Sequence, residues 1–167
     1  LYGGVNTSST LASSGAFALG ATIFKNLGMS SYASQLQIAA EKAWDWAILN
    51  PSTLWQNNDA AYNSIGIGAG KQEVDDYGRL KYKLRAAVYL LEATGKTNYK
   101  TFFDTNYSQI HMMQWTHAYP FEDEEQDILL EYTRLNDATE NIANNILSTF
   151  STAMNGNDNF SAYENEK

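Results

Sequence analysis

The stretch STLASSGAFALGATIFKNL, residues 9–27, decides the fold class of this chain. Apolar or small side chains occupy nearly every side of a helix drawn over it, so we expect a helix that is buried on most of its faces. Hydroxyl side chains at positions 7–10 can cap its first turn. Gly28 supplies the left-handed residue at which such a helix ends.

A second helix is predicted directly after this one. Ser30 or Ser31 is expected to cap it, and it ends at Asn50 because the residue before a proline is pushed out of the helical region. Residues 52–71 have no period and predict a long loop. The apolar positions of the helix recur at helical spacing: Tyr32, Leu36, Ala39, Ala40, Ala43 and Ala47.

The next part of the chain returns to helical periodicity. Leucine, alanine and valine form a stripe over residues 80–91, and Gly95 closes it. A short helix is expected over residues 98–103, whereas residues 104–120 are ambiguous. Isolated strands at most are indicated by Val5 and by residues 65–67.

Two more helices are predicted towards the end of the chain. One has its apolar positions within residues 128–135, and its first turn carries the acidic residues 122–125, which complement the positive end of the helix dipole. Asp137 and Glu140 form a capping-box variant that opens the last helix. Helix, short turn and helix alternate throughout. The sequence therefore predicts an all-α chain of stacked helical hairpins, with residues 1–167 as a single segment.

Composition excludes several classes of function. The formal net charge of −8 leaves no basic stripe for nucleic acid. The chain has no cysteine, which excludes disulfides, a cysteine-bearing zinc site and a thiol nucleophile. No apolar run approaches the roughly 20 residues of a membrane span. The chain opens on Leu1 and not on Met, which indicates processing or a longer parent.

Carboxylates are the first candidates for chemistry. Hydrolysis of a glycosidic bond uses two carboxyl groups about 5–10 Å apart. Glu73, Asp75 and Asp76 follow the long loop, and Glu164 and Glu166 lie in the tail. The favoured interpretation of residues 73–76 is a solvated loop end before a helix, and Asp75 and Asp76 are kept as candidates for contact with a substrate.

Aromatic side chains are the second candidates, because the apolar face of a sugar ring stacks on indole or phenol. Trp44 and Trp46 lie in a predicted helix and are expected in the core. Trp55 and Tyr62 lie in the long loop, where they can meet a ligand. Trp115, close to Tyr119 in the ambiguous stretch, is the strongest candidate for a sugar platform.

Histidine and oxygen ligands give little indication of a metal. His111 and His117 are six residues apart, which is not the spacing of helical zinc ligands. Each is either an ordinary surface histidine or a hydrogen-bonding partner for a sugar hydroxyl, and both are kept as candidates for contact with a substrate. The acidic run 122–127 is interpreted as a solvated first turn. The tail from Asn155 to Glu166 has the spacing of a calcium loop but fails at its glycine position. The sequence predicts no metal and no cofactor.

Several motifs in order resemble glycoside hydrolase family 9, the family of endoglucanases and related cellulases. Residues 9–33 are followed by AAEKAWDWAILNP at 39–51, close to a helix of that family. The stretch EVDD at 73–76 is similar to the family's G-E-Y-G-D segment, and AAVYLLEATG at 86–95 is similar to its A-A-E-L-Y-x-A-T-G helix. Trp115 falls where the family has a tryptophan near the cleft. The likeness covers residues 5–115.

The resemblance implies part of an (α/α)6 barrel. A complete barrel has about twelve helices, and this chain has room for about six. The family's catalytic aspartates lie in a D-A-G-D motif that this chain lacks, and Asn165-Glu166 comes too early to be its N-E motif. Lys81 and Tyr82 stand where many members have the D-E pair of a calcium site. No catalytic residue is therefore assigned within the chain.

Two hypotheses follow. In the first, the parent is a secreted, periplasmic or cell-surface enzyme, in bacteria, that hydrolyses β-1,4-glucan by inversion. This segment then supplies scaffold and cleft wall beside the rest of the parent catalytic domain and is inactive alone. In the second, the chain is a non-catalytic helical-repeat protein that binds carbohydrate. Both have a polysaccharide or oligosaccharide partner and neither has nucleic acid or a membrane span.

Overall fold

The computed structural model describes residues 3–68 and 73–155, and these residues form helices and irregular segments without a strand. The all-α prediction is confirmed, and neither Val5 nor residues 65–67 form a strand. Residues 1–94 and 95–167 are two compact units, which we describe one at a time. The tail beyond Asn155, where the sequence fails the calcium-loop pattern and where Glu164 and Glu166 lie, is outside the described residues.

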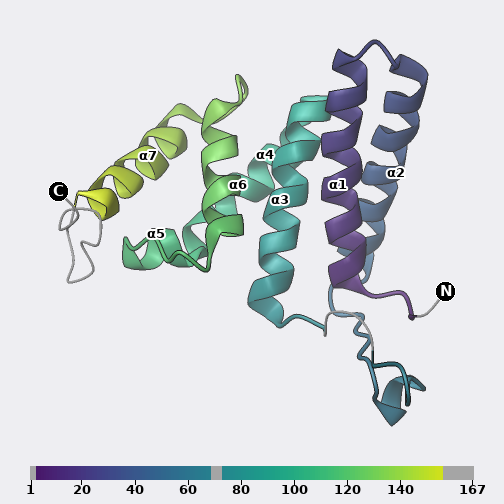
Figure 1. Ribbon diagram of the computed structural model, residues 1–167. Coiled ribbons are helices and arrows are strands. Elements are labelled where there is room, and N and C mark those ends of the chain that lie inside the picture. Colours follow the sequence, from purple (N-terminus) through teal and green to yellow (C-terminus); the bar gives the residue numbers. More distant parts are fainter. Residues whose placement is uncertain (1–2, 69–72, 156–167) are drawn as a thin grey trace. The chain divides into compact units, whose positions relative to one another are not determined.

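The first unit contains three long helices. They are α1 (Thr7–Asn26), α2 (Ser30–Leu49) and α3 (Asp76–Thr94), and α1 lies between the other two (Figure 1). Small side chains let the helices approach closely. The hydroxyl of Ser14 donates to the carbonyl of Ala40 at 2.8 Å, and a Cβ added at Gly15 would lie 3.5 Å from the backbone of Ala86.

The helix ends of this unit agree with the sequence more often than the helix starts. Gly28 has a φ of 79° and ends α1, as predicted. At its start, the cap is Asn6, whose side chain accepts from the backbone N–H of Ser9 at 2.8 Å. Helix α2 follows Met29 without a side-chain cap, so the predicted caps at Ser30 and Ser31 are wrong.

The core of the first unit is aliphatic, with one tryptophan. Trp44 is buried, as predicted, but Trp46 is only half-buried. The expectation that α1 is buried on most of its faces is also wrong, because Phe17 and Ile23 are exposed. The fully buried positions of the core of this unit include Leu11, Ala18, Ala40, Leu84 and Leu90.

Residues 52–68, the described part of the long loop, are irregular, as predicted, apart from the 3-10 turn η1 (Ala60–Tyr62). It is nevertheless held in place by hydrogen bonds. Thr7 and Thr53 exchange two of them, at 2.8 and 3.0 Å. The buried hydroxyl of Ser64 donates to the carbonyl of Gln56 at 2.6 Å and accepts from the N–H of Asp59 at 2.9 Å.

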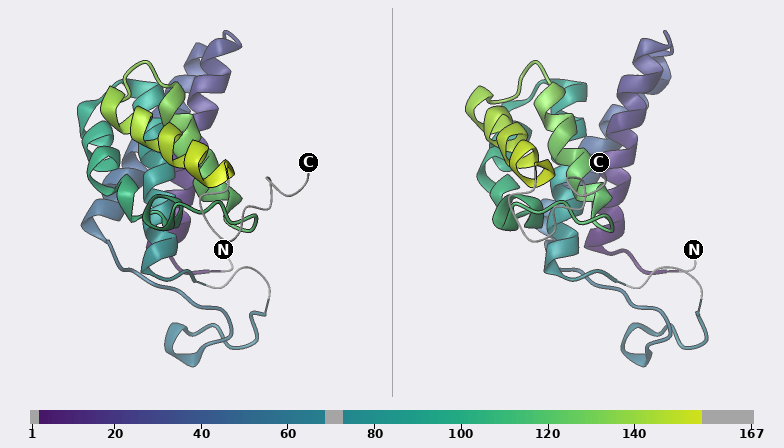
Figure 2. Two further views of the ribbon diagram at one scale, coloured as in Figure 1. Left: turned by 90° about the vertical axis from the view of Figure 1, so that its left-hand side faces the viewer. Right: turned by 60° about the vertical axis from the view of Figure 1, so that its left-hand side comes forward.

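The second unit is built from shorter helices. In chain order they are α4 (Thr97–Asn106), η2 (Tyr107–Gln109), α5 (His111–Trp115), α6 (Asp123–Arg134) and α7 (Glu140–Met154). Helices α6 and α7 lie next to each other, joined by residues 135–139 (Figure 2). Within the ambiguous stretch 104–120, the structure thus has the end of α4, the 3-10 turn and α5.

A buried aromatic pair and a hydrogen-bond network hold this unit together. The rings of Phe103 and Tyr132 stack at 3.9 Å. The hydroxyl of Tyr132 donates to Asp104 and accepts from the backbone N–H of Thr139 at 2.9 Å. The Thr139 hydroxyl donates to the same carboxylate at 2.6 Å. This network joins α4, α6 and the start of α7.

The predicted capping box of α7 does not form. The cap of α7 is Thr139, and it makes no side-chain cap hydrogen bond. The hydroxyl of Thr139 is engaged with Asp104 instead, so a tertiary contact has replaced the local motif that Asp137 and Glu140 suggested. Among the described helices, none combines the length and the apolar character that crossing a membrane requires.

Candidate functional site

Trp55 and Tyr62 are two of the predicted sugar platforms, and both lie in the loop region of the first unit. The indole of Trp55 packs against the backbone of Gly3 and Gly4, and a Cβ at Gly4 would lie 2.5 Å from its ring. Its backbone N–H donates to the carboxylate of Glu73 at 3.3 Å. Tyr62 is half-buried at the end of η1. Trp55 therefore anchors the loop to the start of the chain.

The carboxylates that follow the loop each have a local partner. Glu73 is buried beside Arg79, at 3.7 Å, so its predicted place in a solvated loop end is wrong. Asp75 accepts from the backbone N–H of Gly78 at 2.8 Å, which stabilises the first turn of α3. Asp76 is exposed and pairs with the same Arg79. These contacts give the three side chains structural roles.

The third predicted platform, Trp115, lies in a cluster of rings in the second unit. Helix α5 places His111 and Trp115 four residues apart, on one face, and their rings stack at 4.0 Å. The helix stops at Thr116, whose φ is 52°, and the chain turns back. Tyr119 then meets Trp115 edge-on at 6.0 Å.

Two further rings complete this group. His117 meets Tyr119 edge-on at 4.3 Å, and Phe121 stacks on Tyr119 at 5.1 Å. We call these five residues, His111, Trp115, His117, Tyr119 and Phe121, the Trp115 cluster. Trp115 is 52% exposed and Phe121 is 78% exposed, so the cluster presents ring faces and edges to solvent. The structure thus brings together three of the predicted residues and adds Phe121, which sequence reasoning missed.

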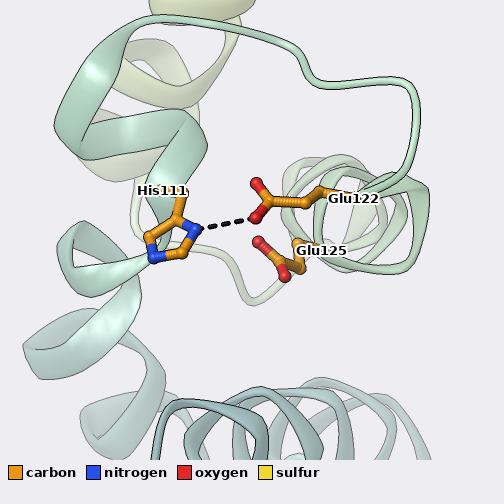
Figure 3. A group of neighbouring side chains, drawn as sticks. All are labelled: His111, Glu122 and Glu125. Atoms are coloured by element: carbon orange, nitrogen blue, oxygen red, sulfur yellow. Dashed lines mark hydrogen bonds and ion pairs between the residues drawn. The ribbon is translucent and has the colours of Figure 1, made fainter.

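The polar side of the cluster is a group of three ionisable side chains (Figure 3). Nδ1 of His111 lies 2.7 Å from Oε1 of Glu122, and one carboxylate oxygen of Glu125 lies within 4.8 Å of both other side chains. Glu125 is only 1% exposed. The interpretation of residues 122–127 as a solvated first turn is therefore wrong for Glu122 and Glu125.

The Trp115 cluster places an exposed apolar ring beside groups that can form hydrogen bonds. An indole half-open to solvent offers an apolar face, and imidazole and phenol groups beside it can form hydrogen bonds with hydroxyls. Residues 4–167 match the family model described as glycosyl hydrolase family 9. The chain belongs to this family. Neither the curated proteins nor the solved structures contain a match.

Membership of glycosyl hydrolase family 9 decides the broad class of the protein. The family match places the protein among the glycoside hydrolases, whose substrates are carbohydrates. The described helices are consistent with part of the (α/α)6 barrel that the sequence resemblance implied. Family membership does not by itself assign a role to the Trp115 cluster. The contacts within that cluster come from the structure of this chain alone.

Two of the site residues could have been found by a different reading of the sequence. Glu122 and Glu125 have the i, i+3 spacing that places two side chains on one face of a helix start. That face became recognisable only once α5 had brought His111 opposite to it, because the histidine lies eleven residues from Glu122 along the chain.

Proposed function

We propose that this family 9 protein is an endoglucanase-type cellulase that hydrolyses β-1,4-glucan with inversion of configuration. Residues 1–167 supply helical scaffold and part of the cleft wall. The catalytic carboxylates lie elsewhere in the parent catalytic domain: an upstream aspartate activates water and a downstream glutamate protonates the leaving oxygen. The enzyme works outside the cytoplasm, in the medium, the periplasm or at the cell surface, where its polymeric substrate is found.

One observation carries the role of this segment in substrate binding. Trp115 keeps half of its surface in solvent although His111 stacks on it and Tyr119 supports its edge. A ring that is already held loses little conformational freedom when a sugar stacks on it, so more of the contact energy appears as affinity. The imidazole of His117 lies beside Tyr119 and offers a hydrogen-bonding group for a hydroxyl.

Substitution of Trp115 tests this role. We expect Trp115→Ala to weaken the binding of cello-oligosaccharides to the 167-residue chain by tenfold or more, which is about 1.4 kcal/mol. Trp115→Tyr retains a flat ring and should recover part of the affinity. Phe17→Ala is the matched control, since Phe17 is an exposed ring on α1. Isothermal titration calorimetry gives the dissociation constants, and equal constants for Trp115→Ala and the parent sequence would contradict the role.

The proposed location of the catalytic groups gives a second test. Without a water-activating aspartate and an acid glutamate facing each other, residues 1–167 alone should release no reducing ends from soluble cellulose. A reducing-sugar assay on the purified chain, with a boiled sample as the blank, measures this. Turnover by the chain alone would show that the catalytic carboxylates are within it, and Glu73, Asp75 and Asp76 would then be the first to replace.

A further inference from the structure

Three side chains of the types that commonly bind metals lie close together where α5 is followed by α6. His111 is the first residue of α5, Glu122 directly precedes α6, and Glu125 lies in the first turn of α6. Their potential ligand atoms all lie within 4.8 Å of one another, and Figure 3 shows both carboxylates facing the imidazole. The three side chains come from two different helices, so the fold itself has brought them together.

The distances suit a small cation. Four-coordinate zinc has bonds of about 2.0–2.2 Å to nitrogen and oxygen, which places its ligand atoms roughly 3.3 Å from one another. Nδ1 of His111 is now 2.7 Å from the Glu122 oxygen, and the largest separation in the set is 4.8 Å. The most widely separated ligand atoms would have to approach each other by about 1.5 Å to reach the spacing that zinc requires.

The charges also favour a cation. Glu125 is 1% exposed, and a second carboxylate, from Glu122, lies in the same group. Placing two carboxylates this close together is costly unless positive charge lies near them, and a divalent cation supplies two positive charges.

The donor set indicates which cation. One imidazole nitrogen and two carboxylate oxygens are typical ligands of zinc and its transition-metal neighbours, while calcium and magnesium prefer oxygen ligands only. Three protein ligands also leave a fourth position for water. We propose that His111, Glu122 and Glu125 bind one divalent cation of the zinc type.

Such a cation would position Trp115. The imidazole that provides Nδ1 is the ring that stacks on the indole at 4.0 Å. A metal bond fixes the plane of an imidazole more firmly than a single hydrogen bond does. His111 is therefore a positioning residue for Trp115, and the bound metal would order the exposed part of the Trp115 cluster. The binding of metal itself does not depend on sugar binding.

Zinc titration tests the site directly. The 167-residue chain, freed of metal with a chelator and dialysed, should bind one zinc ion in calorimetry, with the same stoichiometry by elemental analysis. Glu122→Gln, Glu125→Gln and His111→Gln should each weaken zinc binding at least 100-fold. His117→Gln and Glu124→Gln are matched controls and should bind as the parent chain does. Circular dichroism shows that each variant is folded.

Two further measurements complete the test. Zinc should change the tryptophan fluorescence of the parent chain, and Trp115→Tyr should remove that change while the stoichiometry stays at one. An equal concentration of calcium should not displace the zinc. The proposal is overturned if the folded parent chain takes up no zinc, if Glu122→Gln binds zinc as the parent does, or if calcium displaces it. All of these measurements are made without sugar, so they are independent of the cellulase proposal.

Discussion

Tyr132 is a fully buried residue whose hydroxyl joins α6 to α4 and to the start of α7. Burial, together with the hydrogen bond to Asp104, raises the pKa of Tyr132 to about 12. The folded state therefore favours the neutral phenol, and this contribution to stability is fully present below the unfolded-state pKa of about 10. It is lost as the pH rises towards 12.

We therefore predict that the free energy of unfolding decreases between pH 10 and about 12 more steeply in the parent chain than in Tyr132→Phe. At neutral pH, Tyr132→Phe should lose about 1–3 kcal/mol, because Asp104 and the N–H of Thr139 lose a buried partner. Urea unfolding followed by circular dichroism measures both effects. Tyr32→Phe, at an exposed tyrosine of α2, is the control. Parallel pH curves for the parent chain and Tyr132→Phe would contradict the prediction.

Glu125 shows where sequence reasoning stops at the residue scale. Acidic residues in the first turn of a helix usually face water and complement the dipole, and Asp123 and Glu124 are indeed exposed. Nothing local distinguishes Glu125 from them. Its burial follows from the return of the chain after α5, which is a tertiary event. The ring contacts around Trp115 need less information to predict, since the aromatic residues involved are near neighbours in sequence.

At the scale of the helices, ends were more predictable than starts. Gly28 and Gly95 have φ values of 79° and 68°, a conformation that glycine adopts at little cost, so a glycine after an apolar stripe marks an end reliably. Caps at the start are less certain because several neighbouring side chains compete for the same N–H groups. In α1 the cap is Asn6, one residue before the predicted hydroxyl run.

The assignment of this cap can be tested by a pair of substitutions. Asn6 accepts from the N–H of Ser9 at 2.8 Å and from the hydroxyl of Ser8 at 2.9 Å, and it is buried. We expect Asn6→Ala to lower the free energy of unfolding by about 1 kcal/mol. Ser30→Ala should change it by less than about 0.5 kcal/mol, since α2 begins without a side-chain cap. Urea unfolding compares the two, and a larger loss at Ser30 would reverse the assignment.

At the scale of the whole molecule, the fold class and the family followed from the order of the helical motifs. The all-α prediction is confirmed by the described residues, and the family by the match over residues 4–167. The order of the motifs predicts the fold class because each helix must bury its own apolar stripe, and each stripe can be recognised from the sequence. The division into units at residue 94 was not predicted, since it depends on how densely distant residues pack and not on any local pattern.

The exposed side of α1 gives the last prediction. Phe17 is 39% exposed and Ile23 is 47% exposed, on a helix whose other sides pack against α2 and α3. In the 167-residue chain these two side chains lie at the surface, in contact with water. The folded chain should then bind a hydrophobic fluorescent dye, and the double variant Phe17→Ser and Ile23→Ser should bind less of it. Because these side chains are already in water, the free energy of unfolding of the variant should lie within about 1 kcal/mol of that of the parent chain.

Leu11→Ala, at a fully buried site, is the control. It should lower the free energy of unfolding by about 2–5 kcal/mol and bind no less dye while folded. Unchanged dye binding in the double variant would show that this side of α1 is not the exposed apolar surface.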